Sequence, residues 1–390
     1  MKAKTLAAVL FAFVLCAGPF IARADEPFPE PATFTTLSIT TLAIEGLTGD
    51  AAGNLYTTGR AASPTPCPVW QIDSNGTPPV TPLQIGSIPN SPGACNPSGI
   101  TFDRHGNLYI ADANLGGVIW KLTSADINPT VAFATGVPGT NGLAFDRDGN
   151  LWTGDGTTGQ GRVWKIGPSG GVCEPTFTGC EEVFRIQPMR NSTALGVGRE
   201  NRTVPTSNAQ NLVANGLAFN REGDLYIADT ARGAIWKAEF DRHGNLKSKT
   251  GCDTTFTPNT LCLDNIFVAH PFLEGSDGIA LDRAGNIWNS ANERNAIVVV
   301  TNDKKVVEVF RNDPDGTTHL RNTGPLEFPA SPFLLGKKFC TSNSDGDRRD
   351  NSPRSAGEIN AGGAVGARGK ISCMDQELII RGLPLPVGSD

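Results

Sequence analysis

The residues best suited to chemistry in this chain are five oxygen-bearing side chains that share one position in a repeated pattern. Each stands directly before a glycine, and they are Glu45, Ser98, Asn141, Asn215 and Asp277. Carboxylate and amide oxygens are hard ligands, so this set suits Ca²⁺, or alternatively Mg²⁺ or Mn²⁺, and does not suit a soft metal. We predict that Glu45, Asn141, Asn215 and Asp277 bind the metal. Ser98 has a short side chain and is expected to hold a water or to contact substrate.

Turn formation is an alternative explanation, because Asn-Gly and Asp-Gly pairs are common in turns. It accounts for Asn141, Asn215 and Asp277 but not for Glu45, a poor turn former in the same register. The metal interpretation is favoured, and the turn interpretation stays open.

The elements that must position these side chains are repeats of fifteen residues. Five segments align without a gap: EGLTGDAAGNLYTTG from Glu45, SGITFDRHGNLYIAD from Ser98, NGLAFDRDGNLWTGD from Asn141, NGLAFNREGDLYIAD from Asn215 and DGIALDRAGNIWNSA from Asp277. Each has the pattern of a strand, a tight turn and a second strand. A third apolar run follows each copy, and strand units repeated at this length are typical of propeller blades.

The remaining sequence has room for one more blade. FPASPFLLGKKFCTSNS, from Phe328, resembles a sixth inner hairpin, and either FTTLSI from Phe34 or LIIRGLPLP from Leu378 could supply the strand that closes the ring. We therefore predict an all-β, six-bladed β-propeller of four-stranded blades around a central channel, forming one domain over residues 25–390. In a propeller, equivalent positions surround one axis, so the five oxygen-bearing residues should face a common centre.

The first 24 residues have the features of a signal peptide. Lys2 and Lys4 precede an apolar stretch that begins at Leu6, and the small-x-small sequence Ala22-Arg23-Ala24 offers a cleavage site. We expect a mature chain that starts near Asp25 and is exported to the periplasm or the extracellular space. No later stretch approaches the ~20 apolar residues of a membrane span.

The cysteines agree with export. Without Cys16, eight remain, an even number that favours disulfides in an oxidising compartment. They form neighbouring pairs along the chain: Cys67 and Cys95, Cys173 and Cys180, Cys252 and Cys262, Cys340 and Cys373. Each pair could join a local loop, although sequence alone does not fix the connectivity.

Charge and loop composition add three expectations. The formal net charge of −6 argues against a nucleic-acid partner. The long polar stretch 187–213 is either a lid over the axis or a surface loop. The string NSDGDRRDN, which starts at Asn343 and includes Asp345, is either a second calcium loop or an ordinary polar loop.

The residue before each repeat glycine also carries a family resemblance. Glu45, Asn141, Asn215 and Asp277 resemble the metal shell of the regucalcin/gluconolactonase-like (senescence-marker-protein-like) family of six-bladed propellers, and the repeats are similar to NHL repeats. The resemblance implies calcium-dependent hydrolysis of lactones or phosphotriesters, with Asp277 as the base or nucleophile. Gly139 and Gly142 stand where sugar lactonases of the family often carry Arg and Asp, so sugar recognition is not carried over.

Three functions are consistent with these features. The leading hypothesis is an exported, metal-dependent lactonase or esterase that acts on a small molecule as a monomer. The second is a non-catalytic exported propeller that binds a ligand or a protein, with calcium in a structural role. The third is a condensing enzyme similar to strictosidine synthase, which would use a carboxylate base without a metal.

Overall fold

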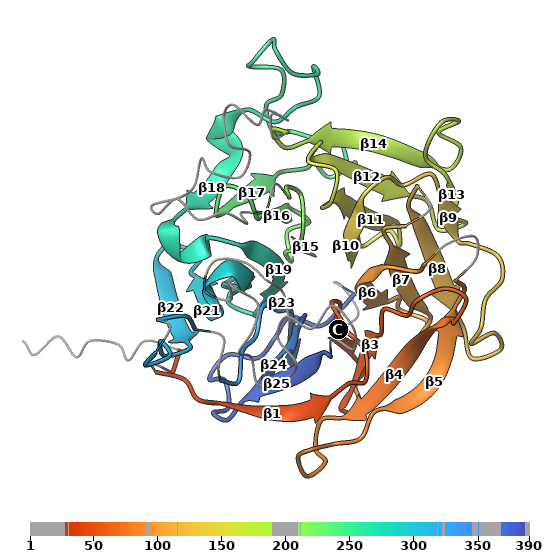
Figure 1. Cartoon of the computed structure of the whole chain (residues 1–390). Coiled ribbons are helices and arrows are strands. Elements are labelled where there is room, and N and C mark those ends of the chain that lie inside the picture. The colour runs from red at the N-terminus through yellow and green to blue at the C-terminus, as the bar shows by residue number, and fades with distance from the viewer. Residues whose placement is uncertain are drawn as a thin grey trace, which may run out of the picture.

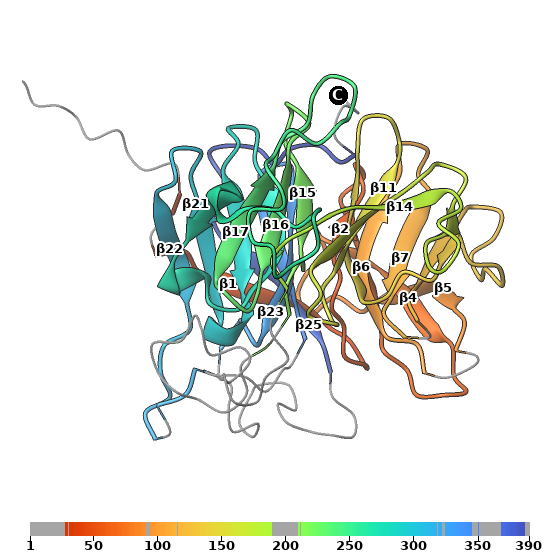
Figure 2. The ribbon, with the colours of Figure 1, turned by 90° about the horizontal axis from the view of Figure 1, so that it is seen from above.

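Six β-sheets surround a central axis in the computed structural model of the chain (Figure 1). The chain is a six-bladed β-propeller with four-stranded blades, as the repeats predict. The structure describes residues 28–29, 31–90, 94–114, 116–188, 210, 212–317, 319–321, 324–344, 350 and 368–386. The signal peptide, most of the stretch 187–213 and the loop around Asp345 lie outside these residues. Figure 2 shows the strands running along the axis.

The first three blades follow one another along the chain. Blade 1 contains β2 (Thr48–Gly49), β3 (Asn54–Thr58), β4 (Cys67–Asp73) and β5 (Leu83–Ile88). Blade 2 contains β6 (Pro97–Phe102), β7 (Leu108–Asp112), β8 (Val118–Leu122), β9 (Ala134–Thr135) and an added edge strand, β13 (Gly171–Val172). Blade 3 contains β10 (Thr140–Phe145), β11 (Leu151–Asp155), β12 (Arg162–Ile166) and β14 (Cys180–Arg185).

The other three blades complete the ring. Blade 4 contains β15 (Leu217–Phe219), β16 (Leu225–Asp229), β17 (Ala234–Ala238) and β18 (Ile266–Ala269). Blade 5 contains β19 (Ser276–Leu281), β20 (Ile287–Ala291), β21 (Ala296–Val300) and β22 (Val306–Arg311). Blade 6 contains β23 (Pro329–Leu335), β24 (Lys338–Asn343), β25 (Lys370–Met374) and β1 (Phe34–Ile39). Short 3₁₀ helices lie at Leu263–Asn265 (η1), Pro271–Leu273 (η2) and Asn292–Arg294 (η3).

The ring is closed by pairing its two ends within blade 6. Strand β1 pairs antiparallel with β25, and Phe34 lies opposite Met374. Of the two segments that the sequence offered for closure, FTTLSI is therefore the one that forms the strand. The other segment crosses one end of the channel, where the amide of Leu383 donates to the carbonyl of Leu281.

The inner hairpins of blades 1, 2, 3 and 5 are each held by an aspartate in the turn. In blade 1, Oδ1 of Asp50 accepts from the amides of Ala52 and Asn54, and Oδ2 accepts from the Tyr56 hydroxyl at 2.7 Å. Equivalent contacts join Asp103 to Tyr109, Asp146 to Trp152, and Asp282 to Trp288. The aspartate and the aromatic residue six positions later therefore fix the hairpin turn.

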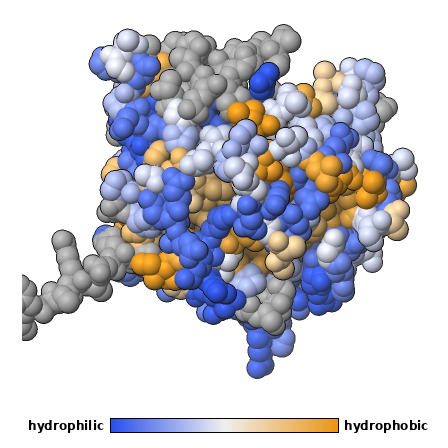
Figure 3. Space-filling view, turned by 90° about the horizontal axis from the view of Figure 1, so that it is seen from below, coloured by the Kyte–Doolittle hydropathy of each residue, from blue (hydrophilic) through white to orange (hydrophobic). Residues whose placement is uncertain are grey.

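The same aromatic residues pack one blade onto the next. Tyr109 contacts Phe145 of blade 3 edge to face with ring centroids 5.0 Å apart, and Trp152 contacts Phe219 of blade 4 at 5.6 Å. Burial of aromatic surface is a major source of core stability. The core thus lies between the faces of neighbouring sheets. Figure 3 shows mostly hydrophilic residues on one outer side of the molecule, with apolar groups between them.

Eight cysteines in the described residues form four local disulfides. The pairs are Cys67–Cys95, Cys173–Cys180, Cys252–Cys262 and Cys340–Cys373. This confirms the predicted pairing of sequence neighbours. Because disulfides persist in oxidising compartments, the pairing supports an exported environment.

The described part of the chain contains no helix that is long and apolar enough to cross a membrane.

Candidate metal centre at one end of the channel

The repeat glycines bring the predicted oxygen donors together around the axis. A Cβ atom on Gly99 would lie 2.1 Å from the carbonyl oxygen of Asn141, and one on Gly216 would lie 2.4 Å from that of Asp277. The same contact recurs at Gly46, Gly142 and Gly278, against the carbonyls of Ser98, Asn215 and Ala330. Each glycine therefore allows its inner strand to approach the backbone of the next blade. The five predicted residues occupy successive blades at one end of the ring, and blade 6 contributes Ala330.

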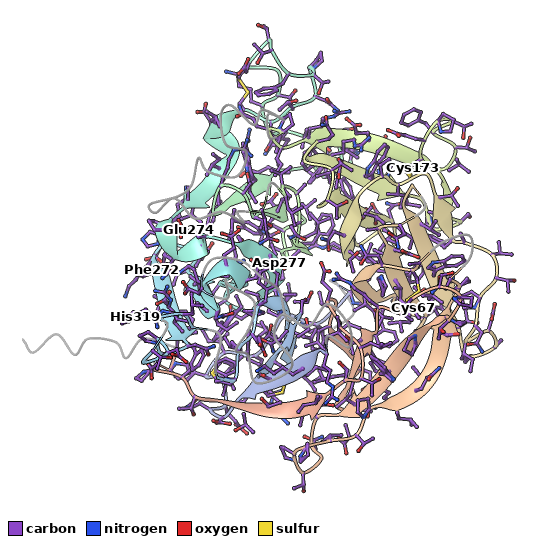
Figure 4. The ribbon with its side chains drawn as sticks, viewed as in Figure 1. Cys67, Cys173, Phe272, Glu274, Asp277 and His319 are labelled. Atoms are coloured by element: carbon purple, nitrogen blue, oxygen red, sulfur yellow. A yellow bond between two sulfur atoms is a disulfide. The ribbon has the colours of Figure 1, made fainter. Side chains whose placement is uncertain are left out.

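Asp277 is the more deeply buried of the two acidic residues in this ring. It belongs to β19 of blade 5 and lies beside the centre of the propeller (Figure 4). Its Oδ2 accepts from Nδ2 of Asn292 at 2.9 Å. Burial raises the pKa of Asp277 to about 7, although the hydrogen bond from Asn292, the charge of Arg60 and a hydrogen bond with Asn215 each act to lower it. Desolvation dominates because it disfavours the charged carboxylate.

Three further hydrogen bonds hold the side-chain amides of Asn215 and Asn292 near Asp277. Nδ2 of Asn215 donates to the Thr230 hydroxyl at 3.0 Å, and that hydroxyl donates to the carbonyl of Ser276 at 2.6 Å. Oδ1 of Asn292 accepts from the side-chain amide of Gln210 at 2.8 Å. The polar groups on this side of the ring are therefore held in place by buried partners.

Ser98 and Asn141 are also buried, in blades 2 and 3. The Ser98 hydroxyl donates to the carbonyl of Thr140 at 3.2 Å, so it bridges two blades while its lone pairs can still accept a hydrogen bond. Asn141 packs against Gly156, where a Cβ atom would lie 2.7 Å from its side chain.

Glu45 has a partner that the sequence analysis did not identify. Its Oε2 forms an ion pair with the guanidinium of Arg60, from the loop after β3. The Glu45 side chain is 15% exposed and that of Arg60 is 32% exposed. Burial lowers the pKa of Arg60, and the charge of Asp277 opposes this shift. A guanidinium therefore lies within electrostatic reach of both ring carboxylates.

The partners of the ring residues lie at a constant distance along the sequence. Arg60, Thr230 and Asn292 each stand fifteen residues after the ring residue that they contact. Extending the gapless alignment by one position would have identified them, together with Gly156, which packs on Asn141. The equivalent residue in blade 2 is Ala113.

The channel is lined by the ring at one end and by apolar inner strands beyond it. It encloses about 90 Å³, with Asn141, Asn215 and Asp277 among its lining residues. Leu383, Leu385 and Pro386 line it as well, and Leu383 is bonded to the far end of β19. The C-terminal segment thus covers the end of the channel opposite the ring.

The donor set fits a hard cation better than a soft one. The described residues contain no group of three His, Cys, Asp or Glu side chains that could hold a metal. The ring instead combines two carboxylates, Glu45 and Asp277, with the amides Asn141 and Asn215, and calcium accepts both kinds of oxygen. Arg60 offsets one of the two negative charges. Their assignment as calcium ligands stays a prediction.

Several other polar residues have structural roles. His105 and His243 are exposed turn residues whose amides donate to Asp103 and Asp241. Nδ1 of His270 accepts from the amide of Phe272 at the start of η2.

Comparison with known proteins agrees with this architecture. The family model described as "SMP-30/Gluconolactonase/LRE-like region" matches residues 97–320. No curated protein is significantly similar to the chain in sequence.

Solved structures show the same fold. A calcium-binding protein, regucalcin, from Agrobacterium tumefaciens has a TM-score of 0.54 and 16% identity, and the match covers 91% of this chain and 96% of that chain. A luciferin-regenerating enzyme has a TM-score of 0.50 and 14% identity, covering 90% and 97%. A PQQ-bound aldose sugar dehydrogenase from Streptomyces coelicolor has a TM-score of 0.54 and 12% identity, covering 89% and 99%. At these identities the similarity shows the fold alone.

Proposed function

The chain belongs to the SMP-30/gluconolactonase/LRE-like family, and from that premise we propose that it is an exported, metal-dependent hydrolase of lactones or esters. The observation that carries the proposal is a buried carboxyl, Asp277, that lines the channel at the end opposite the C-terminal segment and interacts with the amides of Asn292 and Asn215 and with the charge of Arg60. We propose Ca²⁺ as the metal, held by Glu45, Asn141, Asn215 and Asp277. The bound cation would polarise the substrate carbonyl and stabilise the developing oxyanion.

The side chains of the ring have distinct roles in this proposal. Asp277 accepts the proton of the attacking water or attacks the carbonyl itself. Asn292 and Asn215 orient its carboxyl through their hydrogen bonds. The apolar channel wall behind the ring and the C-terminal segment that covers its far end keep bulk water away from the buried face of the site.

The test is a panel of lactones and esters assayed with calcium and with a chelator. Asp277→Asn preserves the size of the side chain and one oxygen, so activity should fall by roughly 10²–10⁴-fold, the range of a positioned acid–base group. Calcium binding should weaken without being lost. Ser98→Ala is the matched control within the ring and should change activity far less.

The outcome also decides between enzyme and binding protein. If calcium-loaded wild-type protein hydrolyses nothing across the panel, the hydrolase proposal fails. A calcium-dependent melting temperature in that protein would then favour the propeller as a binding module with a structural ion.

A further inference from the structure

The residues that stand fifteen positions after the ring residues form an outer set around the candidate metal centre. In four blades this position is neutral: Ala113, Gly156, Thr230 and Asn292. Blade 1 differs, because its residue is Arg60. A repeat position that is otherwise filled by small or neutral side chains therefore carries a positive charge in one blade only, among the five aligned repeats.

The guanidinium of Arg60 is directed at the ring carboxylates. It forms an ion pair with Glu45, and its charge acts on Asp277. An arginine has five donor N–H groups, and the ion pair with Glu45 leaves the buried Nε–H of Arg60 without a partner among the described residues.

We propose that Arg60 is a tethered cation that occupies the cation position of the ring in the metal-free protein and competes with the metal for Glu45. The inference rests on the proposed metal site. For Glu45 to bind the metal, its carboxylate must exchange the guanidinium for the ion. Otherwise the positive guanidinium of Arg60 and the positive metal ion would share a buried site, which is unfavourable at the low effective dielectric there. Arg60 thereby lowers the affinity of the site for metal, and metal binding releases its side chain.

A purely structural role for Arg60 gives the opposite sign. If Arg60 served only to hold Glu45 in position, removing the guanidinium would loosen a ligand and weaken metal binding. If it competes with the metal, removing it strengthens binding. The direction of the change in metal affinity therefore separates the two roles.

The experiment is calorimetric titration of the chelator-stripped full chain with calcium chloride at pH 8. Arg60→Gln removes the charge and keeps a polar side chain, whereas Arg60→Lys keeps the charge. We expect Arg60→Gln to bind calcium roughly 10- to 100-fold more tightly than wild type, within the usual range of coupling between sites, and Arg60→Lys to remain within about threefold of wild type.

Arg232→Gln is the matched control for charge. Arg232 lies two residues after Thr230 in the equivalent loop of blade 4 and pairs with Asp229, which is not a ring residue. It makes the same change in net charge, so a general electrostatic effect would appear in both variants. We expect its calcium affinity to stay within about threefold of wild type.

The remaining outcomes are also decisive. Calcium binding by Arg60→Gln but not by wild type supports the proposal. Calcium binding by wild type that is as tight as, or tighter than, binding by Arg60→Gln overturns the role of Arg60 and leaves the proposed metal site intact. No binding by either protein overturns both.

A measurement on wild type serves if Arg60→Gln does not fold. Modification of Arg60 by an arginine-specific dicarbonyl reagent can be followed by peptide mass spectrometry. Faster modification with calcium than with chelator supports release of the guanidinium, and equal or slower modification overturns it.

Discussion

Replacing Asp277 with asparagine should stabilise the metal-free protein at high pH, although it removes a residue of the candidate site. The folded state raises the pKa of this carboxyl from 3.8 to about 7 because it is buried. The folded protein therefore keeps the proton to a higher pH than the unfolded chain does. This group's contribution to stability is fully present below pH 3.8 and is lost as the pH rises through 7.

The size of the effect follows from the shift. A difference of roughly 3 pKa units at 1.36 kcal/mol per unit corresponds to about 4 kcal/mol. An asparagine at this position carries no charge at any pH and can still accept from Asn292. The free energy of unfolding of Asp277→Asn should therefore match that of wild type near pH 4 and exceed it by up to about 4 kcal/mol above pH 7, an upper bound because Arg60 loses a favourable charge.

Urea unfolding in the presence of chelator, at half-unit steps from pH 5 to 8.5, measures this difference directly. The advantage of Asp277→Asn should grow by roughly 1.4 kcal/mol per pH unit up to about pH 7 and then level off. Ser98→Ala is the control, since it changes a buried ring residue without a titrating group, and its effect should not vary with pH. An Asp277→Asn protein that is less stable than wild type at pH 8, or a difference that is constant with pH, would refute the reasoning.

Two further predictions concern the metal and the glycines. Calcium at a hundredfold excess over Kd should add about 2.7 kcal/mol to the unfolding free energy. Chelation should therefore lower the Tm of wild type but not that of the Glu45→Gln, Asp277→Asn double variant. Equal wild-type Tm values with and without chelator would contradict the proposed metal site. Gly99→Ala should destabilise by about 1–3 kcal/mol, because its Cβ would lie 2.1 Å from a backbone oxygen, whereas Gly316→Ala, with nothing within 4 Å, should change the urea midpoint little.

The fold was predictable because its signal is repeated. A tight turn between two short strands recurs five times in one register, and a repeat needs neighbours to bury its faces. The disulfides were predictable because each joins sequence neighbours. The closing strand was not, since FTTLSI and LIIRGLPLP both offer apolar residues at the right place. Only pairing with β25 selects the first.

The candidate site was predictable in its inner ring and not in its surroundings. The ring residues share one position, so the symmetry of a propeller is enough to bring them together. The ion pair between Arg60 and Glu45 depends on the path of the loop after β3, which no strand pattern specifies. The sequence alignment nevertheless gives the position of Arg60 in the repeat, because Arg60 aligns with Thr230 and Asn292.

The oxygen-bearing side chains are unevenly distributed around the ring, and this affects how the site could coordinate the proposed cation. Blades 3, 4 and 5 contribute Asn141, Asn215 and Asp277 side by side, and blade 1 contributes Glu45 between the short side chains of Ser98 and Ala330. For the proposed cation, ligands would therefore crowd one half of the ring, with a single carboxylate in the other half. Small side chains beside Glu45 leave room for water or a substrate oxygen, and an open coordination position is what separates a catalytic ion from a structural one. Because Arg60 pairs with Glu45, the only acid in that half of the ring, the state of this one ion pair would determine both the charge and the openness of the site.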